Sequence, residues 1–282
     1  MKRILVPCDF SPPAEEAFRF AANIALQNNN SEIHVLYVID GSIINNSETA
    51  TSHSHSLEGL AVKKLEHQWN EKFSEMRKTC APDLRFVTLK IEIGPLIPTI
   101  QNYIVNNQIS LVVMGTHGAS GLKELFFGSK TEKIVRYSKV PVIAVPIGSS
   151  IDTISNIVFP VAPSLCTEVL VREIKGIQNF FRAKLHILWV NTPHLFKSDA
   201  ESAEELQDFA DLHQLTNYTL NTRNEYIETD GILQFAKELP RSLITMPTHG
   251  RQGIRHWLNG SITENVVNHV HCPVWTYSLN NN

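Results

Sequence analysis

The sequence predicts an α/β protein built from two tandem copies of a doubly wound, five-stranded parallel sheet. Short apolar runs alternate with segments of helical periodicity, which is typical of parallel strands covered by helices on both faces. The same pattern then recurs, because residues 157–160 repeat residues 4–7 and residues 243–250 repeat residues 111–118. Recurrence over a whole domain indicates that the chain contains two copies of the same fold.

The length of the chain sets the domain count. Its 282 residues are enough for two domains that each bury a core. Gly148-Ser149-Ser150 reads as a linker between the copies, so we expect domains at residues 1–147 and 154–279. The second copy is shorter mainly because it lacks a long polar stretch and part of one helix.

The first copy begins with an apolar strand at residues 3–8. The next residues turn the chain into a helix at 12–27, whose predicted packing stripe is Ala17, Phe18, Ala21, Ala22 and Ala25. A second strand is expected at 33–38. Residues 40–56 are too hydrophilic for a core, and we expect a mobile loop there.

The remaining elements of the first copy follow the same alternation. Helical spacing at 57–79 is carried by Leu57, Leu60, Leu65, Trp69, Phe73 and Met76. After it we expect a strand at 85–93, a helix at 95–105, a strand at 109–114, a helix at 129–137 and a strand at 142–145. The five strands complete one sheet.

Composition excludes several classes of partner. The net charge is −3 and no sustained run of Lys or Arg is present, so neither nucleic acid nor membrane is an expected partner. No segment is long enough to span a membrane, and the first residues do not form a secretory signal. The four cysteines lack CxxC spacing, which favours reduced thiols in a cytoplasmic protein over disulfides or a zinc site.

Residues 114–132, MGTHGASGLKELFFGSKTE, carry the clearest chemical signal. Gly115 and Gly118 follow an apolar strand, and Gly128-Ser129 opens a helix, so bare backbone N–H groups can line an anion site. A structural alternative stays open. Ser129 with Glu132 also forms a capping box that needs no ligand.

The two copies differ at the positions that matter for binding. Asp9 of the first copy corresponds to Ala162, and Gly115 corresponds to Pro247. We expect the first and fourth strands to be neighbours, and ligands of doubly wound sheets bind beyond the carboxyl ends of such strands. A carboxylate accepts hydrogen bonds from ribose or adenine, whereas proline removes an N–H donor. Asp9 can alternatively cap the helix that follows it.

With these motifs the chain resembles the universal stress protein family in its tandem form, over about residues 1–146 and 155–277. The resemblance implies an adenine nucleotide alpha hydrolase-like fold, ATP binding, and pairing of the copies through their last strands as an internal pseudo-dimer. It places adenine and ribose at Pro7, Cys8, Asp9 and Val38. It places phosphates at Gly115, His117, Gly118, Gly128, Ser129, Lys130 and Thr131, with Met114 beside them.

The expected function is that of a cytoplasmic stress-response protein with ATP, alone or with magnesium, as a regulatory ligand of the first domain. P-loop, GxGxxG and GxSxG patterns are absent from the sequence, and we assign no catalytic or metal-binding residue. Protein partners in stress signalling are expected, and a homodimer is possible. A slow ATPase and a nucleotide-free module for small ligands or proteins remain the alternatives.

Overall fold

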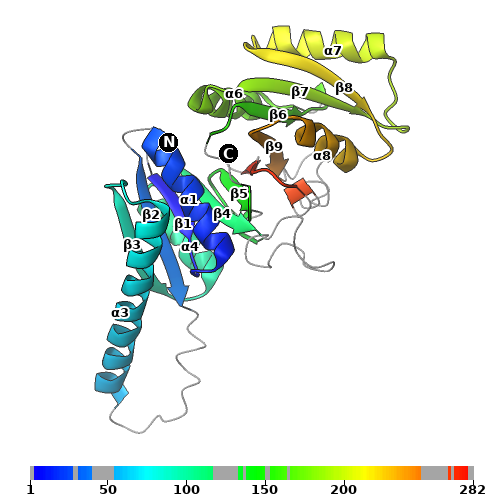
Figure 1. Cartoon of the computed structure of the whole chain (residues 1–282). Helices are drawn as coiled ribbons and strands as arrows, with labels where there is room; N and C mark the ends of the chain where they lie inside the picture. The colour runs from blue at the N-terminus through cyan, green and yellow to red at the C-terminus, as the bar shows by residue number, and fades with distance from the viewer. Residues whose placement is uncertain are drawn as a thin grey trace. The chain divides into compact units, whose positions relative to one another are not determined.

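The computed structural model of the chain describes residues 3–27, 31–39, 54–116, 133–135, 138–149, 153–163, 166–248, 266–267 and 270–278. Side chains are described in these ranges except at 54–66 and 248. The chain divides into two compact units, Met1–Gly115 and Thr116–Asn282 (Figure 1). No helix in the described ranges has the length and hydropathy needed to cross a bilayer.

The first unit contains parallel strands in the order β3-β2-β1-β4. Their bounds are β1 Arg3–Pro7, β2 Glu32–Ile39, β3 Val87–Ile93 and β4 Leu111–Thr116. Strand β1 lies between β2 and β4, because Pro7 pairs with Leu36 on one side and Ile4 with Leu111 on the other. The predicted proximity of the first and fourth strands is therefore confirmed.

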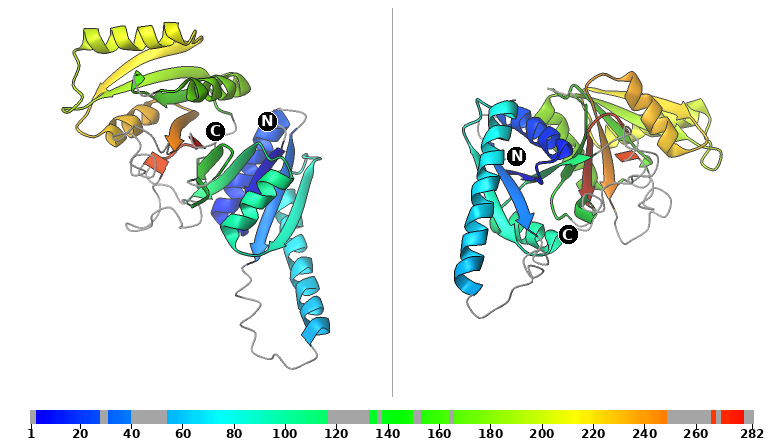
Figure 2. Two further views of the ribbon diagram at one scale, coloured as in Figure 1. Left: turned by 180° about the vertical axis from the view of Figure 1, so that it is seen from behind. Right: turned by 60° about the horizontal axis from the view of Figure 1, so that its bottom comes forward.

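Helices cover both faces of these strands. They are α1 Pro12–Gln27, α3 Ser54–Cys80 and α4 Leu96–Asn106. Helix α1 has the predicted bounds, and all five residues of its predicted stripe are buried. Helices α1 and α3 pack together on one face, whereas α4 lies on the other (Figures 1 and 2).

Some element boundaries differ from the prediction. Helix α3 starts at Ser54 rather than Leu57, because its first turn is polar and gives no apolar periodicity to detect. The rest of the expected polar loop, residues 40–53, lies outside the described residues. Strand β3 starts at Val87 rather than Arg85, and only residues 133–135 of the helix expected at 129–137 are described.

The second unit contains strands in the order β5-β10-β9-β6-β7-β8. The strands are β5 Val142–Pro146, β6 Asn156–Pro160, β7 Lys184–Asn191, β8 Tyr218–Asn224, β9 Ser242–Thr248 and β10 Val274–Ser278. Its helices are α6 Glu168–Phe181, α7 Asp199–Leu212 and α8 Glu228–Glu238. The order β8-β7-β6-β9 matches β3-β2-β1-β4, which confirms the predicted repeat.

The last strands of the two repeats pair with each other. Strand β10 runs antiparallel to β5, with Val274 opposite Ala144 and Trp275 opposite Ile143. These residues are 0–1% exposed. The pairing confirms the expected pseudo-dimer through the last strands, and the doubly wound α/β fold class is likewise confirmed.

Gly115 brings α1 and β4 into close contact. A Cβ atom placed on it would lie 1.9 Å from the carbonyl oxygen of Pro13 and 2.2 Å from the carbonyl carbon. Both obstacles belong to backbone, which cannot move aside as a flexible side chain would. Glycine is therefore required at this position by packing alone.

Replacing Gly115 by alanine tests this packing. We expect Gly115→Ala to lower the free energy of unfolding by about 1–3 kcal/mol, since an added methyl group overpacks the contact with Pro13. The measurement is urea denaturation followed by circular dichroism.

The matched control is Gly176→Ala within α6, where an added Cβ meets no atom within 4 Å. There the same chemical change should raise stability by about 0.5–1 kcal/mol, because alanine favours helix more than glycine does. Equal effects of the two substitutions would contradict the packing argument.

Candidate functional site

The carboxyl ends of β1, β2 and β4 lie along one edge of the first unit, because the three strands are parallel and in register. Four residues predicted to contact nucleotide are placed there with different accessibility. Asp9 is exposed, Pro7 and Val38 are half-buried, and Met114 is buried. Among these four residues, Asp9 is the most accessible predicted ligand contact.

Asp9 is held at the start of α1. Its Oδ1 accepts hydrogen bonds from the backbone N–H of Ser11, at 3.1 Å, and from the Ser11 hydroxyl. The carbonyl of Ser11 in turn accepts from the N–H of Glu15 at 3.0 Å, so Ser11 opens the helix. Asp9 thus bonds the residue at which the helix opens and fixes the turn before α1. Among the described residues, no N–H group of the first helical turn donates to it, so the expected capping role is not what these bonds show. Its Oδ2 has no hydrogen-bond partner within the described part of the chain.

Cys8 faces the core rather than the edge. Its thiol lies 4.0 Å from the sulfur of Met76 in α3 and accepts a hydrogen bond from the N–H of Phe10. Burial raises the pKa of Cys8 to about 12, so the thiol stays protonated near neutral pH. Cys8 can offer a ligand its backbone, but not a reactive thiolate.

Three aromatic rings pack against the loop that carries Asp9. Phe10 stacks on Trp69 of α3 with ring centroids 5.4 Å apart, and Tyr37 of β2 lies 4.2 Å from Trp69. We call Phe10, Tyr37 and Trp69 the aromatic cluster. Burial, and to a lesser extent the charge of Asp9, raise the pKa of Tyr37.

The aromatic cluster was missed by sequence reasoning. Its helical spacing predicts Trp69 in a packing stripe, but Trp69 is less buried than Phe73 and Met76 of that stripe. Tyr37 and Val38 point to opposite faces of β2, as successive strand residues must. The position of Phe10 directly after Asp9 was the only local signal available.

The other predicted phosphate contacts cannot be placed. His117, Gly118, Gly128, Ser129, Lys130 and Thr131 lie outside the described residues. Gly115 is described, and the space beside its Cα is occupied by Pro13 rather than open to a ligand. Close approach of a phosphate at Gly115 therefore stays a prediction, and packing explains the glycine without it.

The second repeat has a different edge at the equivalent strands. Ala162, which corresponds to Asp9, is 8% exposed, so that position offers neither charge nor access. Pro247, which corresponds to Gly115, lies within β9 opposite Tyr277 of β10. The two repeats therefore differ after their first strands in burial as well as in residue type, because Asp9 is exposed and Ala162 is buried.

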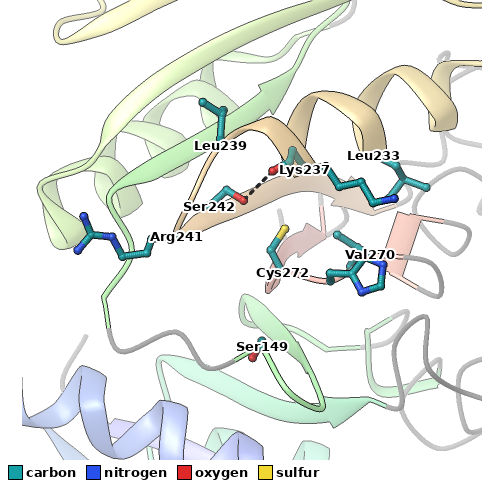
Figure 3. A pocket seen from close by; sticks show the side chains of 10 residues that line it. Ser149, Leu233, Lys237, Leu239, Arg241, Ser242, Val270 and Cys272 are labelled. Carbon is teal, nitrogen blue, oxygen red and sulfur yellow. Dashed lines mark hydrogen bonds between the residues drawn. The ribbon is translucent and has the colours of Figure 1, made fainter.

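A cavity of about 360 Å³ lies at the other end of the second unit, where β9 begins (Figure 3). Lys237, Arg241 and His271 contribute to its lining. Arg241 extends away from Lys237 in Figure 3 and donates to the Thr153 hydroxyl. The buried Ser242 hydroxyl donates to the carbonyl of Ala236. Arg241 does not join Lys237 at this cavity, so we do not assign it as a phosphate site.

Comparisons with known proteins agree with the repeat and the fold. The model of the Universal stress protein family matches residues 1–146 and again residues 153–278. Universal stress protein Slr1230 from Synechocystis is 23% identical, covering 98% of this chain and all of the relative. Universal stress protein MJ0577 from Methanocaldococcus jannaschii is 29% identical, covering 51% of this chain and 94% of the relative.

Solved structures give the same result for the fold. A universal stress protein from Archaeoglobus fulgidus superposes with a TM-score of 0.69 at 18% identity, and the match covers 98% of both chains. A likeness at this identity concerns the fold alone. Because the family model matches both repeats and covers most of the sequence, the chain belongs to the universal stress protein family in its tandem form.

Proposed function

We propose that the first unit binds ATP at the carboxyl edge of β1, β2 and β4, and that bound ATP regulates a cytoplasmic stress-response protein. One observation carries the proposal. The exposed carboxylate of Asp9 lies at the end of β1, between β2 and β4. In doubly wound folds, ligands bind where the strand order reverses, and in this order that point is β1 and β4.

The chemistry of the edge suits a nucleoside. The Oδ2 of Asp9, which has no hydrogen-bond partner among the described residues, is an acceptor for ribose hydroxyls or for an adenine amine. This carboxylate oxygen therefore fits a bound nucleoside.

The aromatic cluster supports the site by holding its loop. Phe10 sits on the loop with a left-handed φ of 59°, an unfavourable conformation for a residue with a side chain. Its contacts with Tyr37 and Trp69 keep it there. Trp69 is thus a positioning residue for Asp9.

Regulatory binding is favoured over turnover by the groups at this edge. Asp9 is engaged with Ser11, and the Cys8 thiol is buried with a raised pKa. Neither is an activated nucleophile. The described part of the edge therefore supports binding better than hydrolysis.

Removing the carboxylate tests the proposal. Asp9→Ala should weaken ATP binding about tenfold, the loss expected for a hydrogen bond to a charged group. Isothermal titration calorimetry on the full chain measures it, with thermal unfolding as a check that the protein remains folded.

Asp83→Ala is the matched control, since Asp83 is an exposed aspartate in the turn between α3 and β3, at the opposite ends of the strands. ATP affinity should be unchanged there. If Asp9→Ala binds ATP as the wild type does, the proposed site is wrong.

A double-variant cycle tests the positioning role of Trp69. Trp69→Leu should weaken ATP binding about fivefold, because the loop that carries Asp9 loses its packing partner. In the double variant with Asp9→Ala, the two losses should not add, since Trp69 acts through Asp9.

Phe86→Leu serves as a control for the loss of an aromatic ring, because Phe86 is 63% exposed and precedes β3. Fully additive losses from Trp69→Leu and Asp9→Ala would instead mean that Trp69 contacts the nucleotide independently.

A further inference from the structure

A second cavity, of about 390 Å³, lies in the second unit at the carboxyl ends of β7 and β8. These strands are parallel and in register, with Asn191 opposite Asn224, so the loops that follow them leave the sheet at the same edge. None of the described lining residues comes from β6 or β9, the strands that correspond to β1 and β4. The end of β7 corresponds to the end of β2, so the cavity adjoins the second repeat's counterpart of the nucleotide site, on the side away from β6 and β9.

Asn191 fixes the geometry of this cavity. It is 3% exposed, its Oδ1 accepts from the N–H of Lys197 at 2.9 Å, and its Nδ2 donates to the Lys197 carbonyl at 2.9 Å. These backbone contacts determine which way the amide points. Nδ2 also donates to Oδ1 of Asn224 at 2.8 Å. The Nδ2 donors of Asn224 consequently face away from Asn191.

Thr192 provides an independent sign of a ligand. The residue lines the cavity and is 3% exposed, and its Oγ1 is buried with no hydrogen-bond partner in the described part of the protein. A buried hydroxyl without a partner costs about 1–3 kcal/mol. Such a group beside a cavity is explained if a ligand supplies the missing partner.

Two exposed aromatic rings border the cavity. Phe196 follows β7 and is 71% exposed, and Tyr226 follows β8 and is 87% exposed. Each ring is next to a residue that Asn191 holds in place. Lys197, which follows Phe196, donates its N–H to the Asn191 side chain. Glu225, which precedes Tyr226, donates its N–H to the Asn191 carbonyl. The faces of exposed aromatic rings attract organic cations.

The charge at the cavity is negative. Among the described lining residues, Glu225 is the only one with a charged side chain. The nearby Lys197 is paired with Glu205 and lies over the Trp189 ring, at 4.8 Å from its centroid. A phosphate would meet Glu225 without a free cation from Lys197 to offset it, so an anionic ligand is disfavoured.

We propose that this cavity binds a small organic ammonium ion that carries a polar arm. The charged head lies with Phe196, Tyr226 and Glu225, and the polar arm meets the Thr192 hydroxyl and the Asn224 amide. This site is independent of ATP binding by the first unit. Choline is a suitable probe, because it combines a quaternary ammonium head with a hydroxyl group.

The first experiment compares choline with 3,3-dimethylbutan-1-ol, its neutral carbon isostere, by titration of the full chain under NMR. We expect saturable choline binding and at least about tenfold weaker binding of the isostere, because only choline gains from the rings and the carboxylate. Equal binding of the two compounds, stronger binding of inorganic phosphate, or no saturable choline binding would each overturn the proposal.

Variants then locate the site. Tyr226→Ala and Glu225→Gln should each weaken choline binding about threefold to fivefold, and both side chains are accessible enough for replacement without unfolding. Thr192→Val keeps the side-chain shape, so it should weaken choline binding while the ligand-free protein becomes more stable. Phe86→Ala, an exposed aromatic residue of the first unit, is the matched control. Unchanged affinity in the three site variants would place binding elsewhere and refute the assignment.

Discussion

The antiparallel pairing of β5 with β10 is the interaction on which the tandem arrangement depends. Each repeat ends in a strand whose outer edge would otherwise expose unpaired backbone groups, a liability for any sheet. Pairing satisfies both edges at once. The Thr276 hydroxyl donates to the Val142 carbonyl across the pair, and Trp275 is almost fully buried. A duplicated chain can thus pair these two edges with each other without a second molecule, which leaves β3 and β8 as the edge strands.

Duplication also allows a residue that serves ligand binding in one repeat to be absent from the other. The fold needs the apolar strands and their order in both repeats, and both retain them. The fold does not need a carboxylate after the first strand of a repeat. The two repeats can therefore differ there, with the exposed Asp9 in the first and the buried Ala162 in the second. In the second repeat a cavity instead lies beside the loops after β7 and β8, the strands that correspond to β2 and β3. The two repeats therefore present different chemistry at corresponding edges.

Several features could be predicted because they depend on local pattern. Helix α1 has an apolar stripe between clear signals at its two ends, and its bounds were predicted correctly. The start of α3 could not be predicted in this way, since its first turn is polar. At the candidate site, Asp9 stood out through comparison of the repeats. The aromatic cluster did not, because Phe10, Tyr37 and Trp69 come from three elements that only folding brings together.

The sequence by itself determined the fold class, the internal repeat and the family, since periodicity and motif spacing are properties of neighbouring residues. Tertiary structure decided what individual side chains do. It assigned Gly115 to packing against Pro13, turned the Cys8 thiol into the core, and left Thr192 buried without a hydrogen-bond partner in the described residues. Each of these outcomes depends on atoms from distant parts of the chain or on burial, and burial exists only once the strands and helices have packed.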